Sequence, residues 1–513
     1  MPEELLKKIK NNIRIQWKIC FVSALAFGFV AHIYKLTNWL PNWDSIVFRY
    51  DGQNMIAMGR WFLPVVCSPS SFYDLPWLTG LLAILFYGLG AVCVCKMFDV
   101  RKNITAGLIG AVVVTFPTVT SVLMYNYVSD GYAIAFLLSC IAAMFLVGEK
   151  PKYVVSAICI ALSSGIYQAY ITVTVMLLLC YLILEGLREG STVLKLLTKS
   201  MKMLLTGIAG MVLYYILTMV ILKVTGAELL EYQGINNAVA FSGINILGAL
   251  YNIKHSFIDY FFDFSSGISA FTVLNCIIFA FTFIFYLGDI IRHRTSPLKL
   301  FLIAVYVIFL PIGASVLAFI NSDVDYHNLM KMGFFVFYLF LMLQYERSEF
   351  KNSKFNALKS WAILVTIFVL VLNNIIIANV SYHKLNMAYE KSYGTLIRIA
   401  DRIEQTEGAD ECDRILVIGA LENSEAYSVK LPPDMTGTTD GYILRADDEI
   451  VGQSVLCSAL NDYCGKNYTF LAGEEKETLL SKLNKEQIGI WPEFDSILVS
   501  DGVIIISLGK EAQ

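Results

Sequence analysis

The sequence predicts a mostly α-helical protein that crosses a membrane many times and carries a small α+β domain at its C-terminal end. Hydrophobic residues make up 57% of the 513 residues and charged residues only 16%, whereas soluble domains carry about 25% charged residues. The mean hydropathy is +0.61, and the apolar residues gather into runs near the roughly 20 residues that span a bilayer. Residues 381–513 lack such a run and are rich in charged residues and turn signals.

The first apolar run follows a basic stretch, KKIKNNIRIQWK, which resembles the start of a signal peptide. No small-residue cleavage site follows, and many more apolar runs do, so we expect an uncleaved first span. Hydropathy predicts a helical bundle of about 11 spans. The predicted spans are 17–35, 77–97, 104–123, 131–148, 152–165, 168–186, 203–223, 270–290, 299–320, 329–345 and 360–380.

Lysine and arginine are concentrated in alternate loops. The positive-inside rule places these loops in the cytoplasm, and the N-terminus with them. We therefore predict a multi-pass cell-membrane protein with a transmembrane domain at 1–380 and an extracytoplasmic α+β domain at 381–513. The basic residues that set this orientation are Lys7, Lys8, Lys10, Arg14, Lys18, Lys96, Arg101, Lys102, Lys150, Lys152, Arg188, Lys195, Lys199, Lys202, Arg292, Arg294, Lys299, Arg347, Lys351, Lys354 and Lys359.

The C-terminal region carries local signals for strands and a helix. RILVIGA at 414–420 indicates a buried strand, and 496–509 indicates a hairpin that turns at Asp501-Gly502. Residues 389–405 have helical spacing, with Leu396, Ile397, Ile399, Ala400 and Ile403 available for one face. Outside the membrane a disulfide is compatible with the compartment, most simply between Cys457 and Cys464. The cysteines inside the spans have no ligand-like spacing and are interpreted as small core residues.

The loop at 42–64, predicted to be extracytoplasmic, holds most of the candidate site. Transfer of a sugar from a phosphate leaving group needs a base and a cation, and we assign these roles to Asp44 and Arg60. Trp43 and Trp61 are candidates for stacking on sugar faces, and Asp51 for contacting the sugar or pairing with an arginine. The alternatives stay open: Asp44 as a solvated carboxylate or helix cap, the tryptophans as interfacial anchors, and Arg60 as a side chain that reaches the headgroups.

Two further outer segments are predicted to contribute. Ser163-Ser164-Gly165 is predicted to end the fifth span before Tyr167 and Gln168. That turn is expected to enter a cavity shared with the 42–64 loop, since irregular backbone at membrane depth needs protein or water around it; a plain tight hairpin is the alternative. Asp130, at the outer start of the fourth span, is a candidate for contacting a sugar hydroxyl.

The outer end of the tenth span supplies a second polar cluster. His327 and Lys331 are four residues apart and are predicted to share a helix face and to bind the donor phosphate. Asp323 and Asp325 are candidates for binding the sugar or acceptor. A divalent ion on these two carboxylates is the less favoured alternative, so we expect no cofactor. In the 224–269 loop, YFFDF at 260–264 fits either a surface segment that guides a lipid tail or a helix packed on the bundle.

In this order the motifs resemble the GtrII glucosyl transferase family, which modifies O-antigens and related surface polysaccharides, and through it the wider GT-C membrane glycosyltransferases. The motifs are Asp44, Gly59-Arg60-Trp61, Tyr167-Gln168 and the closing pattern that begins at Trp491-Pro492 and runs through Asp501-Gly502 to Leu508. The resemblance implies transfer of glucose or a related hexose from a polyprenyl-phosphate donor to a surface glycan on the outer face. GT-C enzymes carry an acidic residue in the first outer loop, which here corresponds to Asp44, although Ser45 rather than a second acid follows it. The implied partners are the lipid-linked donor, the glycan acceptor and membrane lipid, with no nucleic acid.

Two other functions fit a polytopic protein. A transporter or flippase of lipid-linked sugars should show paired repeats and ionisable residues inside broken spans, and no repeat between the halves is apparent. A membrane anchor for a glycan-binding domain would need far fewer spans. The polar clusters on one face favour the enzyme, with the transporter as the alternative.

Overall fold

The computed structural model describes residues 3, 13–47, 55–230, 246–265, 267–292, 295–319, 326–348, 354–421, 449–483 and 488–509. The chain divides into two compact units. Unit 1 comprises Met1–Thr37, Gly52–Asn379 and Leu431–Thr436, and unit 2 comprises Asn38–Asp51, Val380–Lys430 and Gly437–Gln513.

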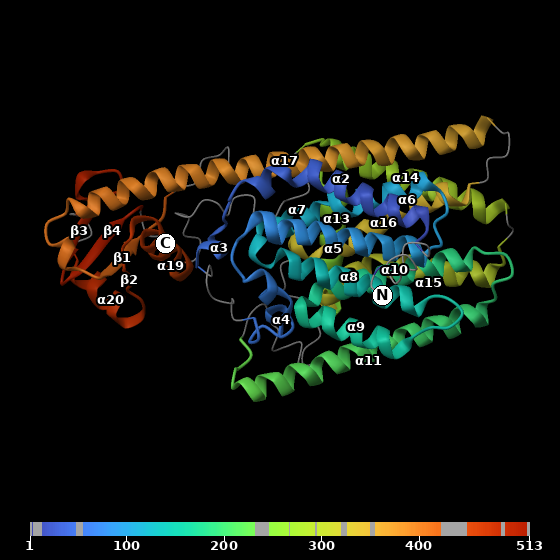
Figure 1. The fold of residues 1–513 in the computed structure, drawn as a ribbon, viewed down its shortest axis with the longest axis horizontal. Helices are drawn as coiled ribbons and strands as arrows, with labels where there is room; N and C mark the ends of the chain where they lie inside the picture. The colour runs from blue at the N-terminus through green and yellow to red at the C-terminus, as the bar shows by residue number, and fades with distance from the viewer. Residues whose placement is uncertain are drawn as a thin grey trace. The chain divides into compact units, whose positions relative to one another are not determined.

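Unit 1 is a bundle of helices (Figure 1). Short 3₁₀ turns connect several of them, including η2 (Asn126–Val128), η3 (Gln168–Tyr170), η5 (Asn328–Met330) and η6 (Met332–Phe334). The α-helices are α2 (Ile15–Thr37), α4 (Leu63–Cys67), α5 (Pro76–Met97), α6 (Asn103–Thr115), α7 (Pro117–Met124), α8 (Ser129–Leu146), α9 (Tyr153–Ile166), α10 (Ile171–Gly186), α11 (Val193–Thr225), α13 (Ile246–Phe262), α14 (Ala270–Arg292), α15 (Pro297–Ala314), α16 (Phe335–Arg347) and the first part of α17 (Lys354–Glu404).

The described helices make this a membrane-embedded protein. Eight of them are long and apolar enough to cross a bilayer, or nine if the bent pair α6 and α7 counts as one further span. The other two predicted spans correspond to α9 and α16, which have 14 and 13 residues and fall short of the roughly 20 that a full crossing needs. The total of about 11 spans therefore stays a prediction.

Close helix contacts in unit 1 depend on small residues, as is usual where lipid surrounds a bundle. A Cβ on Gly110 of α6 would collide with the carbonyl oxygen of Cys20 in α2, and one on Gly90 of α5 would collide with the ring of Phe136 in α8. The pair α6 and α7 bends by 40° at Pro117, which lacks the N–H that a continuous helix would use. Phe116 accordingly has extended backbone, with ψ 135°.

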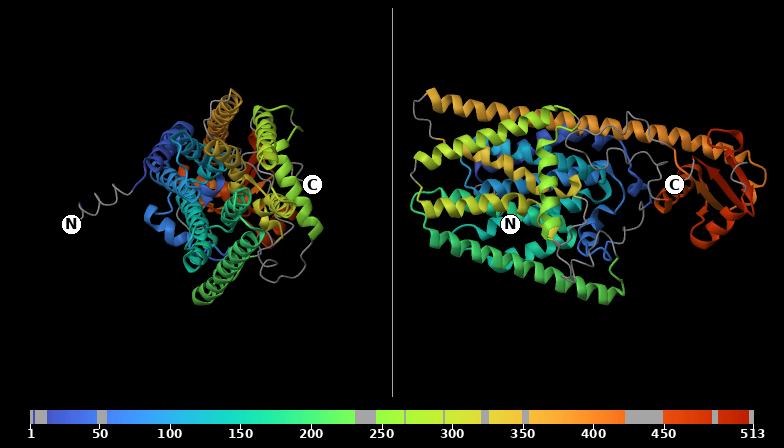
Figure 2. Two further views of the ribbon diagram at one scale, coloured as in Figure 1. Left: turned by 90° about the vertical axis from the view of Figure 1, so that its right-hand side faces the viewer. Right: turned by 180° about the vertical axis from the view of Figure 1, so that it is seen from behind.

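Helix α13 runs across the direction of the long helices (Figure 2). Its buried aromatic side chains pack on η6, directly before α16: the rings of Phe261 and Phe334 are stacked 5.3 Å apart, and Tyr260 meets Phe334 edge-on at 5.1 Å. Of the two interpretations of the 260–264 run, the structure shows the helix packed on the bundle.

Unit 2 contains a four-stranded sheet in the order β2-β1-β4-β3. Strand β1 is parallel to both β2 and β4, and β3 and β4 form an antiparallel hairpin. Figure 1 shows α19 and α20 beside this sheet. Its elements are α3 (Trp43–Val47), the last part of α17, η7 (Ala409–Glu411), β1 (Arg414–Ile418), α19 (Glu449–Cys464), β2 (Thr469–Phe470), α20 (Gly473–Lys482), η9 (Phe494–Ser496), β3 (Ile497–Ser500) and β4 (Val503–Ser507).

The local signals of unit 2 are confirmed. The predicted strand forms β1, and the predicted hairpin turns at Asp501 and Gly502, whose φ angles are +49° and +70°. Two positive φ angles are typical of the tight turn that Asp-Gly favours. The predicted helical face is also correct apart from Ile397, which is 41% exposed, whereas Leu396 and Ile399 are fully buried.

The predicted span at 360–380 and the predicted helix at 389–405 both form, as parts of the single 51-residue helix α17. The predicted disulfide is wrong. Cys457 and Cys464 are free thiols at the middle and the end of α19. Seven residues of helix separate their Cα atoms by about 10.5 Å, and a disulfide needs them within about 7 Å.

Candidate functional site

Arg60 is held by two aromatic side chains from other segments of unit 1. Its Nη1 donates a hydrogen bond of 3.2 Å to the hydroxyl oxygen of Tyr132 in α8. Its Cζ lies 4.7 Å from the ring centroid of Tyr167, between α9 and α10, which is within the range of a cation–π interaction. The rings of Tyr132 and Tyr167 are stacked 4.6 Å apart with an interplanar angle of 8°. The guanidinium is therefore held in one place while the residue stays half-buried.

The backbone before Arg60 is fixed by the turn at Gln168. The side-chain amide of Gln168 donates to the carbonyl oxygen of Met58 at 2.9 Å and to the hydroxyl of Tyr214 in α11 at 3.0 Å. The Tyr214 hydroxyl donates in turn to the carbonyl of Gly59 at 3.2 Å. Gly59 has φ +73°, and a Cβ there would lie 2.6 Å from the Tyr214 hydroxyl. Glycine is thus required both by its backbone conformation and by the close approach of α11.

Trp61 is packed inside unit 1. Its indole N–H donates to the hydroxyl of Thr218 in α11 at 3.1 Å, and only 8% of the residue is exposed. A Cβ on Gly165 would lie 2.7 Å from the indole ring, so the end of α9 approaches the ring closely. This environment gives Trp61 a packing role, and its contact with a sugar stays a prediction.

The turn at Tyr167 and Gln168 thus contacts the segment that contains Arg60, and the cavity expected between them stays a prediction. The helix α9 ends later than predicted, however, since Ser163, Ser164 and Gly165 all lie within it and the backbone becomes extended only at Tyr167. A hydrogen bond to another helix explains why α9 continues through Ser163. The Ser163 hydroxyl donates to the carbonyl oxygen of Ala135 in α8 at 2.9 Å and does not break the helix.

Several tyrosines of this site were missed by sequence reasoning. Besides Tyr132 and Tyr214, a buried pair continues inward, in which the hydroxyls of Tyr170 and Tyr87 lie 2.8 Å apart. The sequence feature that could have identified them is a tyrosine within a predicted span, since a buried tyrosine hydroxyl generally needs a hydrogen-bond partner. Spacing alone does not show which tyrosines meet.

Asp44, the candidate base, lies in the first turn of α3 and is half-buried. It belongs to unit 2, whereas Arg60 belongs to unit 1. Trp43 begins the same helix. The catalytic role of Asp44 and the sugar-binding role of Trp43 stay predictions. Asp51, Asp323 and Asp325 lie outside the described residues.

Asp130 is buried, with 2% exposure, at the start of α8. One carboxylate oxygen accepts a hydrogen bond of 2.9 Å from the backbone N–H of Gly131 and lies 3.8 Å from the thiol of Cys67 in α4. These contacts place its carboxylate in the packing between α8 and α4. Contact with a sugar hydroxyl stays a prediction.

His327 and Lys331 do not share a helix face, so that prediction is wrong. His327 has extended backbone before η5, and Lys331 separates η5 from η6, because α16 begins only at Phe335. The Nζ of Lys331 lies 5.5 Å from the ring centroid of Tyr260 in α13. Both residues are half-buried, and their binding of a donor phosphate stays a prediction.

A buried polar group near the end of α2 was also missed. Lys35 is fully buried and has the carboxylate of Asp74 as a charged neighbour. Asp74 accepts a hydrogen bond of 2.9 Å from the side-chain amide of Asn126. His32, one turn before Lys35, meets the carbonyl oxygen of Val114 at 2.8 Å. An ionisable residue within a span was the available signal, because such residues are expensive to bury and are often functional.

Within the described residues, no group of three or more His, Cys, Asp or Glu side chains is arranged to hold a metal ion. The arrangement at Arg60 instead provides a fixed cation with several N–H donors, which suits binding of a phosphate group.

Comparison with protein families identifies a glycosyltransferase. The family model described as Glucosyl transferase GtrII matches residues 33–344, more than half of the chain. Neither the curated proteins nor the solved structures give a match. The matched range contains Arg60, Tyr132 and Tyr167 and most of the membrane-spanning helices. The resemblance noted from the motifs is therefore confirmed, and the chain belongs to the GtrII glucosyl transferase family.

Proposed function

We propose that this protein transfers glucose or a related hexose from a polyprenyl-phosphate donor to a cell-surface glycan on the outer face of the membrane. Family membership supports glycosyl transfer, and the apolar helices support a membrane-embedded enzyme. A lipid-linked donor fits an enzyme whose helices lie in the bilayer. The distribution of basic loops supports the outward orientation of the candidate site.

The observation that carries this proposal is the way Arg60 is held. Tyr132 binds one guanidinium nitrogen and the ring of Tyr167 covers the guanidinium. A guanidinium fixed in this way loses little conformational entropy when it binds two phosphate oxygens through its planar fork. In the proposed complex Arg60 binds the phosphate of the donor, with Lys331 and His327 as further candidates.

The chemistry then needs a leaving group and a base. In a single displacement, the acceptor hydroxyl oxygen forms a bond to the anomeric carbon while its proton passes to the carboxylate of Asp44. The bond between the anomeric carbon and the phosphate oxygen breaks, and its electron pair leaves with the polyprenyl phosphate. Arg60 stabilises the negative charge that grows on this phosphate, which is the largest electrostatic demand of the step.

A reconstituted transfer assay tests the proposal. The purified protein in lipid vesicles is given a polyprenyl-phosphate donor carrying radiolabelled glucose, together with surface glycan as acceptor. We expect label to enter the glycan only with this donor and only in the presence of the protein. If nucleotide-linked glucose serves equally well, or if the label crosses the bilayer without joining the glycan, the proposed reaction is wrong.

A further inference from the structure

A cavity of about 450 Å³ lies among the basic loops that the sequence predicts to be cytoplasmic. It is formed by the end of α8, the start of α9, α10 and the first turns of α11, all within unit 1. Its size is within the range of small-ligand pockets. None of its residues belongs to the Arg60 site. The residues that line it include Glu149, Tyr153, Tyr181, Thr192, Lys195, Thr198, Lys199 and Lys202.

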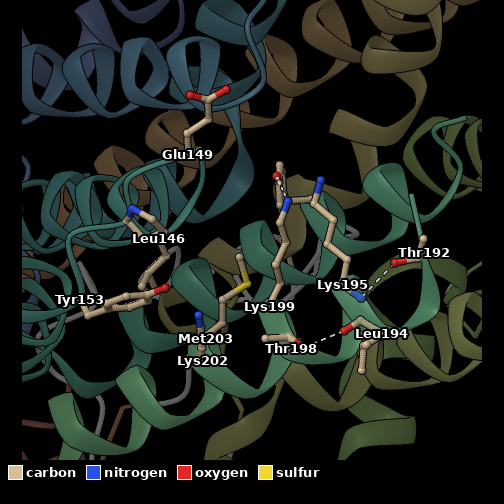
Figure 3. A pocket seen from close by; sticks show the side chains of 13 residues that line it. Leu146, Glu149, Tyr153, Thr192, Leu194, Lys195, Thr198, Lys199, Lys202 and Met203 are labelled. Carbon is tan, nitrogen blue, oxygen red and sulfur yellow. Dashed lines mark hydrogen bonds between the residues drawn. The ribbon is translucent and has the colours of Figure 1, made fainter. Parts of the chain in front are cut away.

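The lining has an excess of positive charge. Lys195, Lys199 and Lys202 are spaced four and three residues apart on α11, which puts them on one side of the helix. Figure 3 shows Lys195 and Lys199 extending from α11 to the same side. One acidic residue, Glu149, also lines the cavity.

Lys199 is already neutralised within the protein. Its Nζ lies 2.8 Å from a carboxylate oxygen of Glu185 in α10 and donates to the hydroxyl of Tyr181 at 3.0 Å. In the part of the chain that the structure describes, neither Lys195 nor Lys202 has a carboxylate within ion-pair distance. These two ammonium groups are therefore available to an anion.

The surface beside the cavity is apolar and exposed. On α11, Leu194 is 75% exposed and Leu204 58%, and on α9 Val154 is 74% exposed. In the most apolar stretch of α11, only 17% is buried inside the protein. This is the smallest buried share among the eight candidate spans of the described residues. Side chains of this kind on a spanning helix face lipid, so acyl chains have a place directly beside the basic lining.

We propose that this cavity binds the phosphate headgroup of an anionic phospholipid whose acyl chains lie along α11 and α9. Lysines at the predicted cytoplasmic end of a span complement the negative charge of that leaflet, and basic pockets between transmembrane helices are suited to phosphate headgroups. Lys195 and Lys202 bind the phosphate, and Lys199, held by Glu185, supports the wall of the cavity. The site is distinct from the proposed donor site at Arg60.

Lipid-dependent thermal stability and native mass spectrometry of the detergent-purified full chain test this site. Phosphatidylglycerol should raise the unfolding temperature and remain bound in the mass spectrum, whereas phosphatidylcholine at equal concentration should do neither. Lys195→Ala/Lys202→Ala should lower the affinity for phosphatidylglycerol roughly 25-fold, because each basic side chain near an anionic headgroup contributes about fivefold. The matched control Lys150→Ala/Lys223→Ala removes the same charge from residues that do not line the cavity and should bind like the parent.

Three outcomes would overturn the proposal. Equal retention of the two lipids by the parent protein is one, and it does not depend on any variant folding. Equal affinity of the lining variant and the control is the second. The third is full reproduction of the stabilisation by inorganic phosphate, which would assign the cavity to a soluble anion instead of a lipid.

Discussion

The guanidinium of Arg60 lies over the ring of Tyr167, with Cζ 4.7 Å from the ring centroid. The two residues belong to segments that are far apart in the sequence. Both also contact Tyr132: Arg60 donates a hydrogen bond to its hydroxyl, and the ring of Tyr167 stacks on its ring. This arrangement fixes a cation at the ends of several helices. The proposed donor-phosphate site depends on it.

Replacing Arg60 should weaken donor binding more than folding. Arg60→Ala should raise the dissociation constant for the polyprenyl-phosphate sugar about tenfold or more, since hydrogen bonds to charged groups contribute about 1.5–3 kcal/mol. Arg60→Lys keeps the charge but loses the planar fork, so an intermediate affinity is expected. Donor affinity is measured by titration of the purified protein, with Arg292→Ala as a control at an exposed arginine. Unchanged donor affinity in Arg60→Ala would remove Arg60 from the site.

The ring of Tyr167 should matter more than its hydroxyl. Tyr167→Phe keeps the ring under the guanidinium and should bind the donor within about twofold of the parent protein, whereas Tyr167→Leu should weaken binding about 3- to 30-fold, as loss of a cation–π interaction predicts. The two variants are compared in the same titration. Equal losses in both would show that the hydroxyl, not the ring, holds Arg60.

Asp44 is proposed to accept the proton of the acceptor hydroxyl. Asp44→Asn removes the proton acceptor at nearly constant volume and should lower the rate of transfer about 100-fold or more, in keeping with the usual contribution of a general base. Initial rates are measured at saturating donor and acceptor, and donor affinity should be unchanged. Asp410→Asn, at an exposed acid of the same unit, is the control. Undiminished turnover in Asp44→Asn would exclude Asp44 as the base.

A methyl group added at Gly59 should strain the backbone next to Arg60 and so disturb the candidate site. Gly59→Ala places a Cβ at φ +73° and 2.6 Å from the Tyr214 hydroxyl, and such strain costs about 1–3 kcal/mol. A lower unfolding temperature and weaker donor binding are both expected. The control is Gly207→Ala in α11, where nothing lies within 4 Å of the added Cβ and where alanine should stabilise the helix by about 0.5–1 kcal/mol. Equal unfolding temperatures for the two variants would contradict this account of Gly59.

The thiols of α19 should be free, and Cys457 should react slowly. Burial raises the pKa of the Cys457 thiol to about 11. The reactive thiolate then amounts to about a thousandth of the population at pH 8, compared with about a quarter for an ordinary thiol. Since the pKa is raised, reactivity should grow as the pH rises toward it. Alkylation of the folded, unreduced protein followed by peptide mass spectrometry measures this, and a Cys457–Cys464 disulfide peptide would refute the structure of α19.

Signals that depend on neighbouring residues were read correctly from the sequence. The turn at Asp501-Gly502 forms because both residues tolerate positive φ angles, and β1 forms where β-branched and other apolar residues run together. The end of α9 was misplaced because Ser163 is satisfied by a carbonyl on another helix, which no local pattern reveals. The prediction that His327 and Lys331 share a helix face was wrong for a similar reason, because 3₁₀ turns stand where an α-helical turn was expected.

The sequence by itself determined that this is a membrane protein of many helices, because the length of an apolar run is set by the thickness of the bilayer. It also determined the family, since the motifs occur in order along the chain, and the hairpin of the C-terminal sheet. Only the tertiary structure decided that Arg60 meets Tyr132, 72 residues away, and Tyr167. Such contacts depend on how each helix is rotated and how closely its neighbours approach, which is a property of packing between distant segments and not of any local pattern.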